Sequence, residues 1–367
     1  MVKKVSLNAR VRGKRTRESL VGWVVFLLGV AGCVTSQQKE GEQYLFGSKL
    51  YGTLTHVEDL PLACRSVETV VGEKPSLLPD GHSFKLVWHD EFNGTRLDES
   101  KWSYRTNFWG RRFSAFAGPE DDCIEVRDGK IHLKLKKRAD GQFCSPQLQT
   151  GSLMWDYPPN PNANSFWPLA KRQPPKFEHC HGYYEARVRL QRRKGWWSAF
   201  WMQSETQGTC LEPARAGIEH DIMESFFPGC VGRHMFHMNG YGEDYVGYSI
   251  PSNSNHTLQV DVDEYHTFGL LWERDGYTVF VDGRRDGEKR GLSTGDAVSQ
   301  VPEFLLISTE CQWYRLNRMS GPASEDLDES ARLGDDFVVD YVRVYDVDSG
   351  REHAAASVVV NDKAGKP

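Results

Sequence analysis

The sequence predicts an all-β protein, either a sandwich or a jelly roll, for three reasons. Short segments of alternating apolar and polar residues recur along the chain, and turn signals such as Asp-Gly pairs separate them. No long amphipathic helix stands out in the sequence. No internal repeat indicates a propeller, so we expect the strands to form packed sheets.

The composition is that of a folding globular protein. Of the 367 residues, 39% are hydrophobic and 12% aromatic, which suffices for one large β domain or two smaller ones. The formal net charge of -5 shows no bias toward nucleic acid, and no basic motif of that kind occurs outside the N-terminus. We therefore expect no nucleic-acid partner.

Residues 1–32 have the pattern of an export signal. Lys and Arg residues precede the apolar run "LVGWVVFLLGV", which ends in small residues and is too short for a transmembrane helix of about 20 residues. The "VAGC" that ends at Cys33 is similar to a bacterial lipobox, whose cysteine carries lipid. We predict a protein anchored to a bacterial membrane or cell surface through lipid on Cys33. The alternative is an ordinary cleaved signal and a secreted protein.

An exported chain meets an oxidising compartment, where disulfides form. The candidate pairs are Cys123 with Cys144, which could join neighbouring strands, and Cys210 with Cys230, which bracket an acidic stretch. Cys64 lies outside the expected domain and is our candidate for an unpaired thiol. The connectivity stays open, because sequence alone does not determine it.

Residues 33–80 are predicted to be a lipid-anchored tether and a lead-in. The piece "TSQQKEGEQ" is polar, and "EKPSLLPDGH" is punctuated by Pro and Gly. From "FKLVWHDEF" onward alternation dominates, so we place a folded domain over residues 81–348. The polar tail at 349–367 is expected to be disordered.

Four segments within the domain are strong strand candidates. In "KIHLKLK", Ile131, Leu133 and Leu135 share one face. In "GYYEARVRL", Tyr184, Ala186, Val188 and Leu190 share a face opposite Tyr183, Glu185, Arg187 and Arg189. The other two segments are "DGYTVFVDG", which lies between two turn signals, and "DFVVDYVRVY".

The stretch "GIEHDIMESFF" at residues 217–227 places three carboxylates in a largely apolar run. Because ionised carboxylates are costly to bury without partners, Glu219, Asp221 and Glu224 either lie on a solvated face or form a site. A helical period also fits the apolar residues, but on a helix Glu219 and Asp221 point in nearly opposite directions. On a strand they share a face, and a β-bulge near Ile222 brings Glu224 onto it.

Several segments together resemble glycoside hydrolase family 16, the laminarinase, agarase, carrageenase and lichenase group. The order Glu-x-Asp-x-x-Glu in "EHDIMES" is similar to its catalytic signature. The resemblance extends over residues 82–347 through "WHDEFNGTRLDESKW", "HGYYEARVRLQRRKGWWSAFWM", "YHTFGLLWERDGYTVFVDG" and "FVVDYVRVYD". It implies a concanavalin A-like β-jelly-roll sandwich of two curved antiparallel sheets, with a substrate cleft on the concave face.

The resemblance also implies an activity. The protein is expected to be a retaining endo-β-glycosidase, with Glu219 as nucleophile, Glu224 as general acid/base and Asp221 bonded to one of them. Two carboxyl groups are what double displacement needs. A lectin-like binding module and a transglycosylase are the alternatives. No cofactor is expected for catalysis.

Aromatic residues are expected to bind the apolar faces of sugar rings. By position in the family, Trp197 and Trp201 are candidates, with Trp313 a further one, whereas Phe200 is expected in the core. His237 resembles a histidine that family members place near the acid/base. For these residues a structural role stays open. The cationic run "RVRLQRRK" would suit an anionic galactan, but no arginine is identifiable among the cleft candidates, so a neutral β-1,3-glucan such as laminarin is favoured.

Asp340 presents a separate problem in the last strand. Strict alternation puts it on the face of Val338, Val342 and Val344, where a bare carboxylate is costly. The family resemblance implies a structural calcium ion held by Asp340 with backbone carbonyls near Glu91 and Gly129. An arginine partner or backbone amides would satisfy Asp340 equally well.

Overall fold

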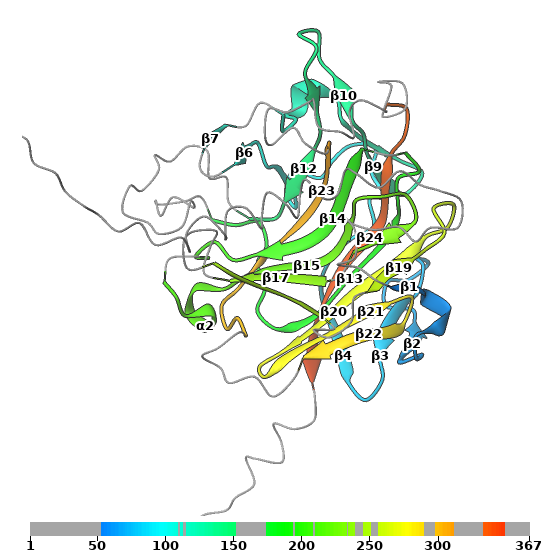
Figure 1. The fold of residues 1–367 in the computed structure, drawn as a ribbon, viewed down its shortest axis with the longest axis vertical. Helices are drawn as coiled ribbons and strands as arrows, with labels where there is room; N and C mark the ends of the chain where they lie inside the picture. Colours follow the sequence, from blue (N-terminus) through cyan, green and yellow to red (C-terminus); the bar gives the residue numbers. More distant parts are fainter. Residues whose placement is uncertain are drawn as a thin grey trace, which may run out of the picture.

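Two antiparallel sheets contain most of the strands, as the sequence predicts (Figure 1). The structure is a computed structural model that describes residues 53–108, 111–112, 115–151, 174–193, 195–207, 210–232, 234–238, 245–250, 256–289, 298–311 and 333–348. Trp313, Cys33 and the 349–367 tail lie outside these ranges.

The first sheet has seven strands. In spatial order they are β18 (Val246–Ile250), β17 (His234–Met238), β15 (Glu219–Ser225), β14 (Trp196–Gln203), β23 (Phe304–Cys311), β12 (Gln147–Gln149) and β5 (Ser103–Tyr104). The acidic stretch forms β15, near the middle of this sheet. It is a strand and not a helix.

The second sheet has eight strands. In spatial order they are β22 (Arg284–Lys289), β21 (Gly276–Val281), β20 (His266–Glu273), β13 (Gly182–Arg189), β24 (Phe337–Asp348), β9 (Lys130–Leu133) and β8 (Ile124–Arg127), and β4 (Ser83–Asp90) also pairs with β24. All four segments that the sequence singles out as strands lie in this sheet.

The remaining elements are short. They are β1 (Thr53–His56), β2 (Cys64–Val67), β3 (Ser76–Pro79), β6 (Asn107–Phe108), β7 (Arg111–Arg112), β10 (Lys136–Lys137), β11 (Phe143–Cys144), β16 (Cys230–Val231) and β19 (His256–Gln259), with the helical turns η1 (Val57–Asp59), η2 (Pro119–Asp121) and α2 (Pro213–Ala216). None of the helices in the described ranges has the length and apolar character needed to span a lipid bilayer.

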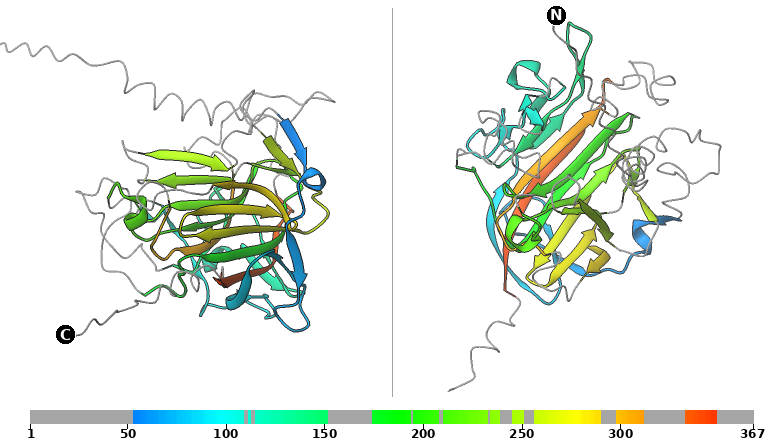
Figure 2. Two further views of the ribbon diagram at one scale, coloured as in Figure 1. Left: turned by 90° about the horizontal axis from the view of Figure 1, so that it is seen from below. Right: turned by 60° about the vertical axis from the view of Figure 1, so that its left-hand side comes forward.

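The main hydrophobic core lies between the two sheets. It contains the predicted apolar faces of both alternating segments: Ile131, Leu133, Leu135, Tyr184, Ala186, Val188 and Leu190. Phe200 and Ile307 enter this core from the first sheet, and Val342 enters it from the second. Figure 2 shows the resulting layers, with β23 (orange) of one sheet lying along β24 (red) of the other in its right-hand view. The predicted jelly-roll sandwich is confirmed.

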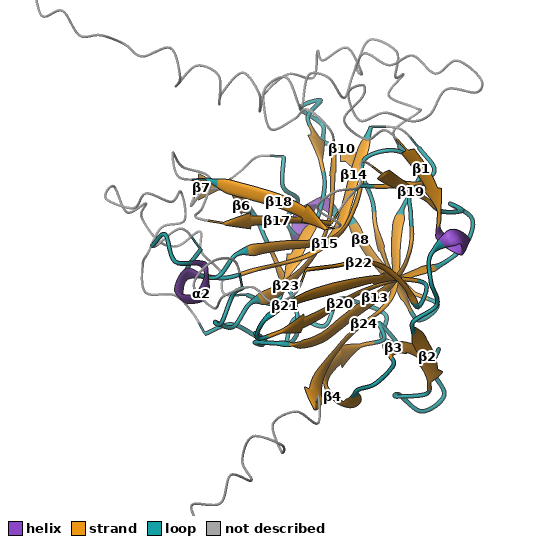
Figure 3. Cartoon of the chain, turned by 60° about the horizontal axis from the view of Figure 1, so that its bottom comes forward, coloured by secondary structure: helices purple, strands orange, loops and turns teal. Residues whose placement is uncertain are grey.

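A second apolar cluster covers the outer face of the eight-stranded sheet. Cys64 and Leu78 pack there against Tyr183, Leu271 and Phe280. β2 and β3 thus lie against this sheet, beside β4 (Figure 3). The packed unit therefore begins before residue 81, where the sequence places its start, and Cys64 lies inside it.

This cover changes the environment of the face that the sequence marks as polar. Glu185 is fully buried and accepts a hydrogen bond from the Leu77 amide at 2.7 Å. Its burial raises the pKa of the carboxyl to about 7. Alternation indicated the two faces of β13 correctly, but it did not indicate that β2 and β3 cover the polar one.

Candidate active site

The β-bulge that we predicted near Ile222 is present in β15. Ala199 of β14 pairs with Glu224 and Phe200 pairs with Met223, but Trp201 pairs with Asp221. Ile222 is the extra residue, so the prediction of a bulge near Ile222 is confirmed.

The bulge brings three carboxylates to one face of the sheet. Their cross-strand neighbours on β14 are Gln203 beside Glu219, Trp201 beside Asp221 and Ala199 beside Glu224. Ala199 and Trp201 belong to a small cluster outside the main core, so this is the outer face of the seven-stranded sheet. Without the bulge, period-two alternation would turn Glu224 into the core.

The opposite face of β15 serves packing. Ile222 and Met223 lie in the main core. His220 is fully buried, and its Nδ1 lies 2.5 Å from Glu303 Oε2. Glu303 also accepts a hydrogen bond from the Ile218 amide at 3.2 Å.

Glu219 is oriented by a chain of amide side chains. Gln203 donates a hydrogen bond from Nε2 to Glu219 Oε2 at 2.8 Å, and its Nε2 also lies 3.0 Å from Gln207 Oε1. Gln207 in turn donates to the His237 carbonyl at 2.9 Å. These contacts fix the Glu219 carboxylate rotamer, which a nucleophile needs to attack from one direction.

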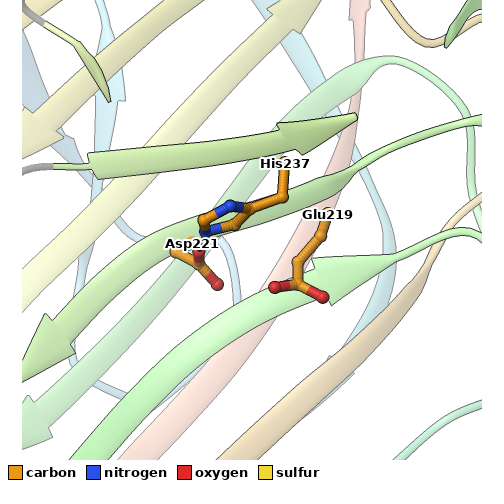
Figure 4. A group of neighbouring side chains, drawn as sticks. All are labelled: Glu219, Asp221 and His237. Atoms are coloured by element: carbon orange, nitrogen blue, oxygen red, sulfur yellow. Dashed lines mark ion pairs between the residues drawn. The ribbon is translucent and has the colours of Figure 1, made fainter. Parts of the chain in front are cut away.

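Asp221 and His237 form an ion pair beside Glu219. His237 Nε2 lies 3.0 Å from Asp221 Oδ2, and its Nδ1 lies 2.5 Å from the Tyr245 hydroxyl. Figure 4 shows the His237 ring directed at Asp221, with Glu219 next to them. Burial opposes protonation of the ring, but the hydrogen bond and charge of Asp221, with the charges of both glutamates, raise the pKa of His237 to about 9.

The same three residues satisfy a simple geometric criterion for holding a metal ion. One potential ligand atom from each of Glu219, Asp221 and His237 lies within 4.8 Å of the others. A metal ion at His237 would have to displace the proton that Asp221 favours on this ring. The contacts between these side chains are those of a hydrogen-bonded acid–base cluster.

Glu224 is held in a different environment. Trp197 donates a hydrogen bond from Nε1 to Glu224 Oε1 at 2.9 Å. Burial, followed by the negative charge of Asp221, raises the pKa of Glu224 well above its ordinary value. A carboxyl group with a raised pKa keeps its proton to a higher pH than an ordinary carboxyl group does, and it can donate that proton to a leaving group.

The predicted aromatic residues have different surroundings. Trp197 contacts Glu224 and stacks on Phe226, with ring centroids 4.8 Å apart. Trp201 is buried on the same outer face and donates from Nε1 to Ser308 Oγ at 3.0 Å. Trp197 is thus placed at the site, and Trp201 lies on the face that carries it.

Sequence reasoning missed three residues near the site: Gln203, Tyr245 and Arg105. Alternation along β14 places Gln203 on the face of Trp197 and Trp201, so its position was accessible from the pattern. Arg105 reaches the site from a distant part of the chain, whereas Tyr245 lies only eight residues from its partner His237, and strand alternation signals neither position.

Arg105 corrects one premise of the substrate expectation. Its guanidinium carbon lies 5.0 Å from the centroid of the Trp201 ring. An arginine is therefore present on the face that carries the three carboxylates, whereas none was identifiable there from the sequence.

Strict alternation predicted that Asp340 shares a face with Val342 and Val344. In the structure it does not. Arg187 pairs with Tyr341 and Val188 pairs with Val339, so Asp340 is the extra residue of a bulge in β24. It forms an ion pair with Arg187, and Lys130 Nζ lies 3.7 Å from its other carboxylate oxygen.

These partners bear on the predicted calcium site. Asp340 is its one side-chain ligand, and two cations already engage that carboxylate. The side chain of Glu91 pairs with Arg343 at 2.7 Å, and Gly129 occupies a turn with φ of 67°. The arginine alternative for Asp340 is what the structure shows, and a calcium ion would have to displace Arg187 and Lys130 from this carboxylate.

The cysteines are free thiols where the structure describes their side chains. Cys123 and Cys144 lie next to each other, with their sulfur atoms 3.8 Å apart. Cys210, Cys230 and Cys64 are also free, so a Cys210–Cys230 bond is not present in this structure.

Comparisons with known proteins point to carbohydrate-active enzymes. Residues 123–301 match the sequence model described as glycosyl hydrolases family 16. The chain is 28% identical over 302 residues to "Glucan endo-1,3-beta-glucosidase A1" of Niallia circulans, covering 71% of this chain and 37% of that protein. It is 24% identical over 292 residues to "Beta-porphyranase C" of Zobellia galactanivorans, covering 71% of this chain and 76% of that protein.

The fold has known counterparts as well. A crystal structure described as SCLam, a non-specific endo-β-1,3(4)-glucanase from family 16, superposes with a TM-score of 0.51 at 22% identity. The match covers 82% of this chain and 99% of that one, and at this identity it shows the fold alone. The chain spans little more than a third of the length of the Niallia circulans relative.

Proposed function

This chain contains a glycosyl hydrolase family 16 domain, and from that premise we propose that it is a retaining endo-β-glycosidase acting on a β-linked polysaccharide. The observation that carries the proposal is the bulged strand β15. It places Glu219, Asp221 and Glu224 on one face, with Glu224 in surroundings that favour its protonated form. Two carboxyl groups in different protonation states are what double displacement uses.

In the proposed mechanism, Glu219 attacks the anomeric carbon while Glu224 gives its proton to the leaving oxygen. Water, activated by the now ionised Glu224, then hydrolyses the glycosyl-enzyme. Gln203 fixes the attacking carboxylate, and the Trp197 indole fixes the acid. Asp221, paired with His237, keeps a negative charge beside Glu224 and so favours its protonated form.

For the substrate we favour a neutral β-1,3-glucan such as laminarin, with a marine galactan next. The glucanase relative supports the first, and the porphyranase relative together with Arg105 supports the second. The test is reducing-sugar release from laminarin, lichenan, agarose, porphyran and carrageenan at several salt concentrations. Binding of an anionic polymer weakens as ionic strength rises, whereas binding of a neutral glucan does not. Cleavage of only the sulfated polymers, with a salt-sensitive KM, would overturn the glucan preference.

Two other activities share this fold and are separated by the same assay. A lectin-like module would bind a polysaccharide and release no ends from any of them. A transglycosylase would form the same glycosyl-enzyme but pass the sugar to a hydroxyl group, so its products grow longer. Product lengths measured by chromatography distinguish transfer from hydrolysis.

The proposed location is outside the cytoplasm, with lipid on Cys33 as the anchor. The basic and apolar N-terminal pattern ending at "VAGC" supports this assignment. Expression in a bacterial host with labelled fatty acid should label the wild type and leave Cys33→Ser unlabelled. An unlabelled wild type that is released into the medium would favour the cleaved signal.

Calcium at Asp340, Gly129 and Glu91 is an untested hypothesis. Because Arg187 and Lys130 already neutralise Asp340, we expect a chelator to leave the melting temperature unchanged. If a chelator lowers the melting temperature and added calcium restores it, the result would support a calcium ion at this site.

A further inference from the structure

The bulge in β15 leaves a backbone group that the sheet ladder does not bond. The paired register of β15 with β17 ends at Asp221 and Met235. Further along, the Gly232 amide donates to the Glu224 carbonyl at 2.8 Å. The Ile222 carbonyl lies between these two connections, inside the protein, and a buried carbonyl needs a donor.

His234 supplies that donor from the first residue of β17. Its Nδ1 lies 2.6 Å from the Ile222 carbonyl oxygen, and its Nε2 lies 2.8 Å from Asp286 Oδ2 in β22 of the other sheet. Both side chains are essentially inaccessible to solvent, at 0% and 1% exposed. The bulge is thus tied through the sandwich to the second sheet.

The bonding partners determine the protonation of this pair. A carbonyl oxygen only accepts, so Nδ1 carries a proton. The bond from Nε2 to Asp286 then requires one more proton, either on the imidazole facing a carboxylate or on Asp286 facing a neutral ring. In either arrangement Nδ1 donates to Ile222, so the bond to the bulge does not depend on which partner holds the second proton.

Stability alone is a poor explanation for this pair. The free energy needed to desolvate two ionisable groups is about as large as the free energy gained from their attraction. An apolar pair of similar volume often stabilises a core equally well. The bond to the bulge gives the pair a different role, because Ile222 sits between Asp221 and Glu224 and its peptide orientation determines how both carboxyl groups project.

We infer that His234 and Asp286 are positioning residues for the proposed glycosidase, holding the β15 bulge so that Glu224 faces Glu219 across the substrate. The catalytic part of this inference rests on the proposed function. The structural part, that the pair stabilises β15 locally, is independent of the proposed function.

The test compares two double variants. His234→Leu with Asp286→Leu removes the bond without leaving a buried charge. His234→Asn with Asp286→Asn retains an N–H at the position of Nδ1 and removes the charges as well. His266→Leu is the control, because it breaks another His–Asp contact, 2.7 Å long, on β20.

The leucine variant should fold, keep KM within about twofold and lose about 10²-fold in kcat, since small misplacement of catalytic groups costs that much. Hydrogen exchange across residues 217–227 should be faster in it. The asparagine variant should recover most of kcat and of the protection, and the control should match the wild type in both.

Each outcome decides the inference. Wild-type kcat and wild-type exchange at 217–227 in the leucine variant would overturn it, as would an asparagine variant no better than the leucine one. If the leucine variant does not fold, kcat and hydrogen exchange at 217–227 in the asparagine variant alone decide the inference. If the wild type cleaves no polysaccharide, the proposed function fails, and the exchange comparison still decides whether His234 holds the bulge.

Discussion

Glu219 and Glu224 have different neighbours, and these neighbours suit the different roles that we propose for them. An amide side chain holds Glu219, whereas burial and the Asp221 charge raise the pKa of Glu224. Glu219→Ala should therefore lose hydrolysis by about 10⁴-fold or more, and azide should restore glycosyl transfer because a small anion fits the vacated space. Kinetics with product analysis would measure this, and the product should be a glycosyl azide.

The acid/base variant supplies the contrast. Glu224→Ala should lose about 10²- to 10⁴-fold on the polysaccharide and much less on aryl glycosides, whose leaving groups need no proton. Near-normal hydrolysis of the natural substrate by either folded variant would show that the assignment is wrong.

The pH dependence follows from the raised pKa of Glu224. Activity requires its proton, so kcat/KM should persist above the ordinary carboxyl range and fall as pH passes the raised pKa. Asp221→Asn removes the charge that raises this pKa, so the alkaline limb should move to lower pH. Trp197→Phe removes a hydrogen bond that favours the ionised form, so the limb should move to higher pH. Profiles of kcat/KM would show whether the two shifts have opposite signs, and shifts in the same direction would contradict this account.

At the scale of single elements, the bulge in β15 was predictable and the bulge in β24 was not. The resemblance of "EHDIMES" to the family signature favoured a shared face for the three carboxylates of β15, and on a strand only a bulge provides one, so this irregularity was predictable. In β24 the bulge sits at Asp340, and a run of valines gives no sign of it. His234 escaped prediction for the same reason, since its role depends on a backbone carbonyl and not on a residue type.

Two short elements make a covalent prediction of their own. Cys123 and Cys144 are buried, with sulfur atoms 3.8 Å apart and Ala117 packed beside them. Oxidised glutathione should join them, releasing two molecules of reduced glutathione. The bond closes a loop between positions 21 apart and should add about 3 kcal/mol to the free energy of unfolding.

Thermal unfolding with oxidant and with reductant would measure the gain, and thiol counting would show the loss of two sulfhydryl groups. Cys123→Ser should melt at the same temperature in both conditions. An equal thiol count before and after oxidation of the folded wild type would refute the pairing.

Across the whole molecule, the sequence predicted the sandwich fold better than it predicted the residue at which the folded unit begins. Alternation is strong where strands face the main core, and it located the segments that became β9, β13, β21 and β24. β2 and β3 are four residues each, and the segment around them is rich in Pro and Gly, so they resembled a linker. The contribution of β2 and β3 to the fold becomes clear only from the face of the eight-stranded sheet that they bury.

That cover makes residues 53–80 part of the stable unit. Arg343 donates to Ser76 Oγ at 2.7 Å and to the Lys74 carbonyl at 2.8 Å, and the Tyr345 hydroxyl lies 2.5 Å from the same Ser76 oxygen. A chain that starts at residue 81 would expose the fully buried Arg343 and Glu185 together with the apolar surface under Leu78.

We expect that truncated chain to melt about 10 °C or more below a chain that starts at residue 53. Loss of two or three buried apolar side chains costs about 4 kcal/mol or more, and each kcal/mol corresponds to about 2–4 °C at this size. Differential scanning calorimetry of the two chains makes the comparison, and a shared melting temperature would mean that β2 and β3 only rest on the sheet. Because β15 lies in the other sheet, the truncated chain should keep its kcat at temperatures where it remains folded.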